Sequence, residues 1–236
     1  MQTHFFPAQA RGLKDLGWLK SHLSFSFSDY KNPTQAGFGL LRVFNDDFVQ
    51  PGGGFGIHPH ANMEIISVLL NGKMSHIDSL GYSEEIEAGG VQIMSAGTGL
   101  RHEEHNIGTE EVNFLQIWIE PKLQNIPPRY QKRHFPKDQR QNQLSTIVSQ
   151  AAGTAHCWIN QDARLSLGFF EAGFSCPYQL EAAHKAVFVF NLSGQIQIGQ
   201  QPLNARDGLG IWATDTLRIE ILQTAEFVLI EVPINH

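Results

Sequence analysis

Short apolar runs recur along the whole chain, and most of them end at glycine, proline, asparagine or serine. Runs of this length between such residues are typical of β-strands. No long stretch keeps the spacing of an amphipathic helix. The pattern therefore predicts an all-β protein. The expected strands cover residues 39–45, 64–70, 73–78, 84–88, 91–95, 100–106, 112–119, 155–160, 163–170, 186–192, 195–198, 209–213, 217–222 and 226–232.

A polar stretch separates two series of predicted strands. Residues 120–144, EPKLQNIPPRYQKRHFPKDQRQNQL, are rich in proline, glutamine and charge, which is typical of a linker that crosses the surface. The segments on either side resemble each other, because both run strand, Asn-Gly or Ser-Gly turn, strand, short excursion and strand. We therefore predict two related β-barrels in tandem, with domains at residues 1–130 and 131–236.

The composition narrows the classes of function. The 236 residues carry 17 basic and 23 acidic side chains, a formal net charge of −6. A nucleic-acid partner is not expected, because such binding relies on a basic surface. The N-terminal residues lack a secretory apolar core, no run is long enough to span a bilayer, and the two cysteines are too few for a disulfide framework. We expect a cytoplasmic protein with free thiols and no membrane association.

Two pairs of residues carry the candidate chemistry. His58 and His60 are two residues apart, so on a strand both side chains point to the same side. Pro59 cannot donate a backbone hydrogen bond, which places this segment at a strand start or a barrel rim. His102 and Glu104 have the same spacing on a later predicted strand. Hydrogen bonds alone could satisfy such residues, but two same-face pairs can also converge inside a barrel.

Three neutral imidazoles and one carboxylate fit a divalent first-row metal, since imidazole suits iron, nickel, copper and zinc and a carboxylate favours the harder ions. Four ligands leave two octahedral positions open, as a catalytic site requires. A closed structural zinc site more often uses cysteine, and neither Cys157 nor Cys176 lies near these segments. The ligand types leave the choice of metal open.

Other residues near these pairs have several interpretations. Glu64 starts an apolar run four residues after His60, so its carboxylate needs a partner. It could be a fifth ligand, an acceptor for the N–H of a ligating imidazole, or a salt-bridge partner, and we favour the imidazole acceptor. Gln116 and Trp118 could line a cavity, although core packing is the expected role of Trp118.

Two further pairs receive structural interpretations. Glu103 and His105 lie on the strand face opposite to His102, and we expect them to be solvated or paired with each other. His76 and Asp78 repeat the two-residue spacing, and we expect a hydrogen-bonded pair at the surface. Neither pair is assigned to the candidate metal site.

The segments HPHANMEI, HIDSLG, GGVQIMSAGTGLRHEEHN and LQIWIEP resemble the pirin family within the cupin superfamily. The resemblance covers most of residues 35–130, includes the opening DLGWLKSHLSFSFSDYKNP, and is looser in the second half. It implies a bicupin, in which the family's metal ligands correspond to His58, His60, His102 and Glu104. In pirins Glu104 takes the role that other cupins give to a carboxylate at the position of Glu64.

Two positions depart from the family pattern. Ser95 stands where the second motif usually has proline, and Glu103 stands where many pirins have a small residue. The extra charge of Glu103 either tunes metal affinity or faces solvent. The second half has no His-x-His or His-x-Glu pair, so we expect one metal, in the domain at residues 1–130, and a packing role for the domain at residues 131–236.

The likeness to bacterial pirin-like quercetin 2,3-dioxygenases implies a metal-dependent oxidoreductase that opens the heterocyclic ring of a flavonol with O2. Fe(II) is the expected metal, with nickel, cobalt, manganese, copper and zinc as alternatives, and Glu104 is the candidate catalytic base. Eukaryotic pirins, which act as metal-dependent transcription coregulators, imply an alternative: a regulatory protein with a protein partner. A third hypothesis, a cupin that binds a small molecule without catalysis, is disfavoured by the intact ligand set.

Overall fold

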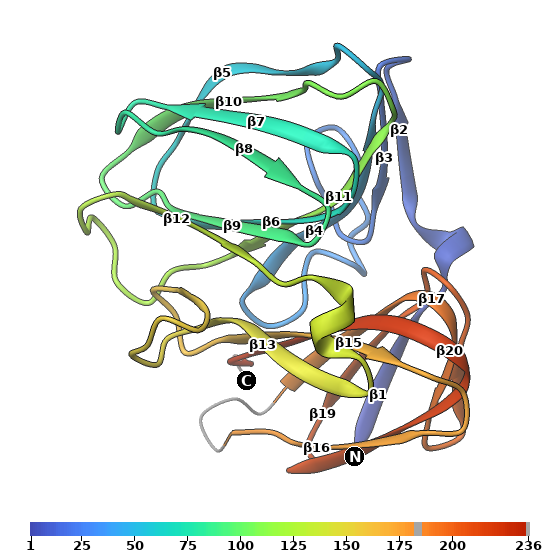
Figure 1. Cartoon of the computed structure of the whole chain (residues 1–236). Coiled ribbons are helices and arrows are strands. Elements are labelled where there is room, and N and C mark those ends of the chain that lie inside the picture. The colour runs from blue at the N-terminus through green and yellow to red at the C-terminus, as the bar shows by residue number, and fades with distance from the viewer. Residues whose placement is uncertain (182–185, 235–236) are drawn as a thin grey trace.

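The computed structural model describes residues 1–181 and 186–234, and the regular secondary structure of these residues is almost wholly β-strand (Figure 1). Two β-barrels lie one above the other, the N-terminal barrel drawn mainly in blue to green and the C-terminal barrel mainly in yellow to red (Figure 1). The predicted all-β class and the tandem arrangement are confirmed. No helix in the described part of the chain is long and apolar enough to cross a membrane.

Two sheets form the N-terminal barrel. The larger sheet has the strand order β12-β9-β6-β11-β4-β3-β2, and the smaller sheet has the order β5-β10-β7-β8. The larger sheet contains β2 (Gly12–Asp15), β3 (Leu19–Leu23), β4 (Leu41–Val49), β6 (Glu64–Asn71), β9 (Gly90–Ser95), β11 (Val112–Ile119) and β12 (Arg129–His134). The smaller sheet contains β5 (Gly54–His60), β7 (Lys73–Asp78), β8 (Ser83–Glu87) and β10 (Leu100–Asn106).

One sheet forms the C-terminal barrel. Its path runs β1-β19-β17-β20-β15-β13-β14, with β16 beside β20 and β18 beside β17. Its strands are β1 (Gln2–Phe6), β13 (Gln143–Ser149), β14 (Cys157–Trp158), β15 (Arg164–Phe170), β16 (Ser175–Gln179), β17 (Ala186–Ile198), β18 (Gln201–Leu203), β19 (Gly208–Trp212) and β20 (Thr216–Val232). The 3-10 helices η1 (Ala8–Ala10) and η2 (Lys137–Arg140) lie in connections between the barrels.

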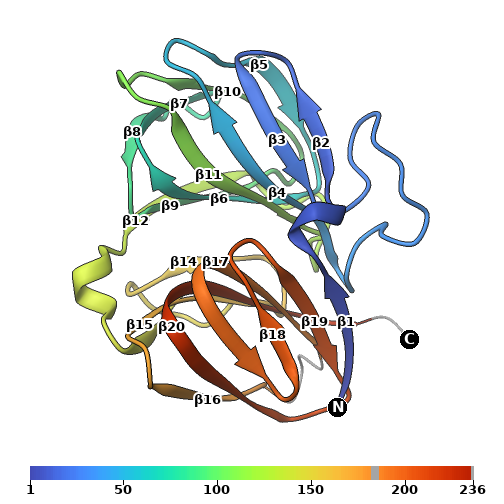
Figure 2. The ribbon, with the colours of Figure 1, turned by 90° about the vertical axis from the view of Figure 1, so that its right-hand side faces the viewer.

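The first strand of the chain joins the C-terminal barrel. β1 pairs antiparallel with β19 along its whole length, and Figure 2 shows the two strands side by side. Phe6 at the end of β1 packs edge-on against Phe25 and Phe188, with ring centroids 5.7 and 5.5 Å away. No strand was predicted before residue 39, and β1 gives little hydrophobic signal because only Phe6 of its five residues is buried.

The connection between the barrels is shorter than the predicted linker at residues 120–144. Strand β12 lies inside that stretch, crosses the predicted boundary between residues 130 and 131, and pairs along its length with β9 of the N-terminal barrel. This strand was not predicted from the sequence, because β12 lies at the end of its sheet and only Tyr130 among its residues is buried. An edge strand with polar side chains carries little hydrophobic signal.

The two barrels differ in what fills them. One apolar cluster lies between the barrels, where Phe44 of β4 meets Phe188 and Phe190 of β17 with ring centroids 5.1 and 4.6 Å away. A second cluster fills the interior of the C-terminal barrel. The N-terminal barrel holds smaller clusters, and polar side chains occupy the interior between them. Cys157 and Cys176 are both buried and free.

Candidate metal centre

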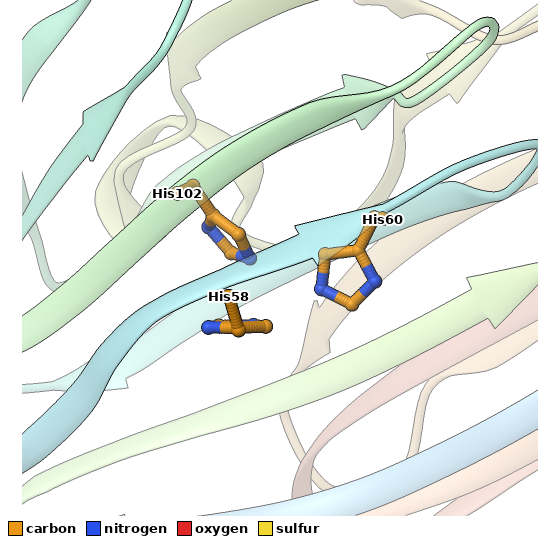
Figure 3. A group of neighbouring side chains, drawn as sticks. All are labelled: His58, His60 and His102. Atoms are coloured by element: carbon orange, nitrogen blue, oxygen red, sulfur yellow. The ribbon is translucent and has the colours of Figure 1, made fainter.

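Strands β5 and β10 bring three histidines to one point in the N-terminal barrel (Figure 3). The strands pair antiparallel, with His102 opposite His58 and Leu100 opposite His60. The ring centroids lie 4.8 Å apart for His58 and His60, 4.4 Å for His58 and His102, and 5.1 Å for His60 and His102. One potential ligand atom from each ring lies within 4.8 Å of the other two. The predicted convergence of these three residues is confirmed.

The hydrogen bonding and charge of the three rings suit a metal ion. His102 is 2% exposed, and neither of its ring nitrogens has a hydrogen-bond partner. Burial lowers the pKa of His102 to about 2 and that of His60 to about 4, so both rings are neutral at pH 7. The ring nitrogen Nδ1 of His58 lies 2.8 Å from the carbonyl oxygen of Gly56, and a proton donated there leaves Nε2 free to bind a metal. An unpaired buried nitrogen costs free energy unless a ligand satisfies it.

Glu104 lies next to this group but not within it. The pairing of β10 with β5 is irregular between His102 and Glu104, so that Glu104 stands opposite Phe55. Its carboxylate joins a second group of potential ligands with His76 and His102. The side-chain amide of Gln92 donates a hydrogen bond to Oε1 of Glu104, and burial raises the pKa of Glu104 to about 7. The structure therefore gathers three of the four predicted ligands and places the fourth beside His102 alone.

His76 belongs to the barrel interior, which corrects the prediction of a surface pair. Its side chain is fully buried, its Nε2 lies 3.1 Å from Oδ2 of Asp78, and its ring stacks on Tyr130 with centroids 4.4 Å apart. The His76 ring centroid is 5.4 Å from that of His102. The predicted pairing with Asp78 is confirmed. Burial of the pair follows from β7 lying beside β10, where His76 stands opposite Glu104.

Two family models match the chain: Pirin over residues 7–119, and the quercetinase C-terminal cupin domain over residues 146–232. A relative from Caulobacter vibrioides, named pirin-like protein, is 38% identical over 226 residues that cover 95% of this chain and 97% of the relative. The chain belongs to the pirin family. A relative from Escherichia coli K12, named quercetin 2,3-dioxygenase, is 37% identical over 227 residues that cover 96% of each chain.

A solved structure adds a metal to the comparison. The crystal structure of the bacterial pirin YhhW from Escherichia coli in complex with nickel(II) matches this pirin with a TM-score of 0.93 and 35% identity, over 99% of this chain and 100% of that one. The predicted bicupin fold is thereby confirmed. In this pirin the unpaired nitrogens of His102, beside His58 and His60, fit a divalent ion of the same kind.

A cavity of about 440 Å³ opens beside the three histidines of this pirin. Aromatic and aliphatic side chains form much of its wall, and the histidines and polar side chains of the larger sheet contribute to the remainder. The apolar lining includes Leu16, Trp18, Phe27, Phe55 and Ile65. The polar lining includes Ser21, Asn45, Asp47 and Gln116. A small-molecule site commonly has this size and this mixture of surfaces.

Trp118 and Gln116 both line this cavity. The prediction that Gln116 lines a cavity is confirmed. Trp118 was expected to be a core residue, but it lines the cavity and is only partly buried. The Trp118 ring meets the His60 ring edge-on at 5.1 Å and the Phe27 ring at 5.4 Å, and its surface is only partly buried. Alternation along β11 explains the result, because residues 116 and 118 share the face that points into the barrel.

Glu64 faces the C-terminal barrel, so the favoured role as an imidazole acceptor is wrong. Its Oε2 accepts hydrogen bonds from Oγ of Ser95 at 2.8 Å and from the backbone N–H of Asn160 at 3.1 Å. Its neighbour Ile65 instead lines the cavity beside the three histidines. Successive residues of a strand point to opposite sides, so only one of the two can face the histidines. The carboxylate links the barrels.

Replacing Glu64 with glutamine is expected to change how stability depends on pH. Burial is the main cause that raises the pKa of Glu64 above its ordinary value of 4.5. The folded protein then holds this proton to higher pH than the unfolded chain, so wild type loses stability relative to Glu64→Gln as pH rises above the ordinary value of 4.5 and through the raised pKa of Glu64. Urea denaturation of chelator-treated protein measures both variants. Glu120→Gln, at a half-exposed site, is the control. A Glu64→Gln difference that stays constant with pH contradicts the prediction.

Glu103 and His105 lie outside the candidate centre. The Nε2 of His105 is 3.6 Å from Oε2 of Glu103, and both side chains are partly exposed. The expectation that these two residues are solvated or paired with each other is confirmed. Of the alternatives for Glu103, this position favours a partly solvated charge on the strand face opposite to His102.

Proposed function

We propose that this pirin is a metal-dependent dioxygenase that cleaves the heterocyclic ring of a flavonol such as quercetin. The observation that carries the proposal is the cluster of His58, His60 and His102, with both nitrogens of the buried His102 ring unpaired, in the wall of a partly aromatic cavity. The cavity volume of about 440 Å³ lies in the range that binds small organic molecules. The name of the Escherichia coli relative points to the same class of substrate.

His58, His60 and His102 would hold the ion, and Glu104 would complete the set when its carboxylate leaves Gln92. A bound divalent ion, for which we expect Fe(II), would supply a Lewis acid for the flavonol oxyanion and a centre for reaction with O2. Nickel, cobalt, manganese, copper and zinc are the alternatives, because imidazole and carboxylate ligands accept each of them.

The protein's own groups supply proton transfer and positioning. Glu104 would be the base that takes the proton of the flavonol 3-hydroxyl, because it lies beside His102 and burial in the metal-free barrel raises its pKa to about 7. Trp18, Phe55 and Trp118 offer flat apolar surfaces that exclude water around an aromatic ring system. The overall change consumes one O2 and releases the ring carbon that bears the hydroxyl as CO, after both of its ring carbon–carbon bonds break.

Quercetin turnover tests the proposal directly. Protein loaded separately with each candidate metal is expected to remove the visible absorbance of quercetin and release an equal amount of CO, with at least one metal active. His102→Ala, treated in the same way, controls for the reaction of free metal with the flavonol. Absence of CO above the level of this control, for every metal and several flavonols, would reject flavonol cleavage.

A further inference from the structure

Asn45 is a buried polar side chain that the proposed chemistry does not use. It lies on β4 and is 1% exposed, and neither Oδ1 nor Nδ2 of its amide has a hydrogen-bond partner. Buried amides are almost always paired, and leaving both atoms unpaired costs free energy. A stability role therefore does not account for asparagine at this position.

Strand geometry directs Asn45 into the cavity that holds the histidines. Phe44, its neighbour, packs in the cluster between the barrels, whereas Asn45 lines the cavity beside the three histidines. On the adjacent strand Gln116 stands directly opposite Asn45 and lines the same cavity. Trp118, two residues further along that face, has a buried indole N–H that also lacks a partner. Unpaired polar atoms thus share one cavity with the candidate metal ligands.

Asp47, two residues along β4 from Asn45, has a hydrogen-bond partner, whereas Asn45 has none. Ser21 on β3 donates a hydrogen bond from its hydroxyl to the carboxylate of Asp47, which points into the same cavity. The Ser21 hydroxyl proton is thus taken by Asp47, and Asn45 retains one free acceptor and one free donor group. A phenolic hydroxyl is both a donor and an acceptor and matches this combination.

We propose that Asn45 is a specificity-determining residue that binds a hydroxyl substituent of the aromatic substrate, other than the hydroxyl at the metal. This inference rests on the proposed function, and it narrows the substrate class to polyhydroxylated aromatic compounds. Sites built to pair a substrate hydroxyl discriminate against analogues that lack it, because the site's polar groups are then left unpaired.

Two ligands and a leucine substitution separate this role from others. Quercetin carries several hydroxyls, whereas 3-hydroxyflavone keeps only the metal-binding hydroxyl and its neighbouring carbonyl. Affinities are measured by titration calorimetry on protein loaded with Zn²⁺, which has no redox chemistry of its own. For Asn45→Leu we expect the Kd of quercetin to rise about tenfold and that of 3-hydroxyflavone to stay unchanged.

Thermal unfolding supplies the second readout. Leucine fills a similar space without unpaired polar atoms, so the Tm of Asn45→Leu is expected to equal or exceed that of wild type. Asn191→Leu is the matched control, because the buried Asn191 amide donates to the carbonyls of Gly194 and Leu203, both at 3.0 Å. We expect this control to lower the Tm and to leave both affinities unchanged.

Each outcome assigns failure to one proposal or the other. An Asn45→Leu variant that weakens both ligands equally, weakens neither, or loses stability as Asn191→Leu does overturns the recognition role. Wild-type protein that binds quercetin more tightly than 3-hydroxyflavone but releases no CO overturns only the dioxygenase proposal. Wild-type protein that binds neither ligand overturns both.

Discussion

His102→Ala is expected to lose its metal and with it all metal-dependent activity. The His102 ring belongs to both groups of potential ligands among the described residues, and its two nitrogens have no other partner. Residues that merely support a metal ligand change affinity by about 10–100-fold, so removal of a shared ligand should exceed about 100-fold. Elemental analysis of purified protein and titration with Ni²⁺ measure the loss.

Variants on the same strand make the interpretation specific. Glu103→Ala changes the neighbouring residue on the opposite face and is expected to retain wild-type metal content. Glu104→Ala tests the fourth ligand. This variant should weaken metal binding strongly only if the Glu104 carboxylate leaves its hydrogen bond with Gln92 and binds the ion. Because His102 makes no hydrogen bond, metal-free His102→Ala should fold as wild type does by circular dichroism. Full metal content in His102→Ala would show that the site lies elsewhere.

Asp46→Asn is expected to destabilise the protein by about 3–5 kcal/mol, the cost of breaking a buried ion pair. Asp46 is 1% exposed and accepts hydrogen bonds from Arg206 at 2.9 Å, Arg11 at 3.4 Å and Asn113 at 2.9 Å. Arg206 comes from the C-terminal barrel, whereas Asp46 lies on β4 of the N-terminal barrel, so this cluster joins the barrels. Burial lowers the pKa of Arg11, and the nearby Asp46 carboxylate partly opposes this shift. The charged form of the Arg11 guanidinium is therefore stabilised by Asp46.

Urea denaturation measures this loss, which is a large part of the roughly 5–15 kcal/mol that stabilises a typical domain. Arg42→Ala serves as the control, since Arg42 pairs with Glu120 at 3.3 Å on the surface, with both side chains nearly half exposed. An exposed pair of this kind contributes less than about 1 kcal/mol. If Asp46→Asn and Arg42→Ala lower stability by the same amount, the interbarrel cluster has no special role.

Local patterns in the sequence were sufficient for much of the strand assignment. The strands at residues 73–78, 100–106 and 112–119 have the predicted bounds, because turn residues and apolar runs mark both ends of each. The two-residue spacing also placed His58 and His60 on one side of β5 and paired His76 with Asp78. These relations are local and follow from the geometry of a single strand.

Sequence patterns alone were enough to predict the all-β class and two tandem barrels, and they raised the convergence of the histidines as a hypothesis. The folded arrangement was needed to show that Glu64 faces the other barrel, that His76 is buried beside His102, and that the unpaired Asn45 side chain lines the cavity. Likewise, only the fold placed β1 in the C-terminal barrel. The physical reason is that alternation tells which residues share a strand face, whereas the inward face and the neighbouring strand depend on how the distant segments close each barrel.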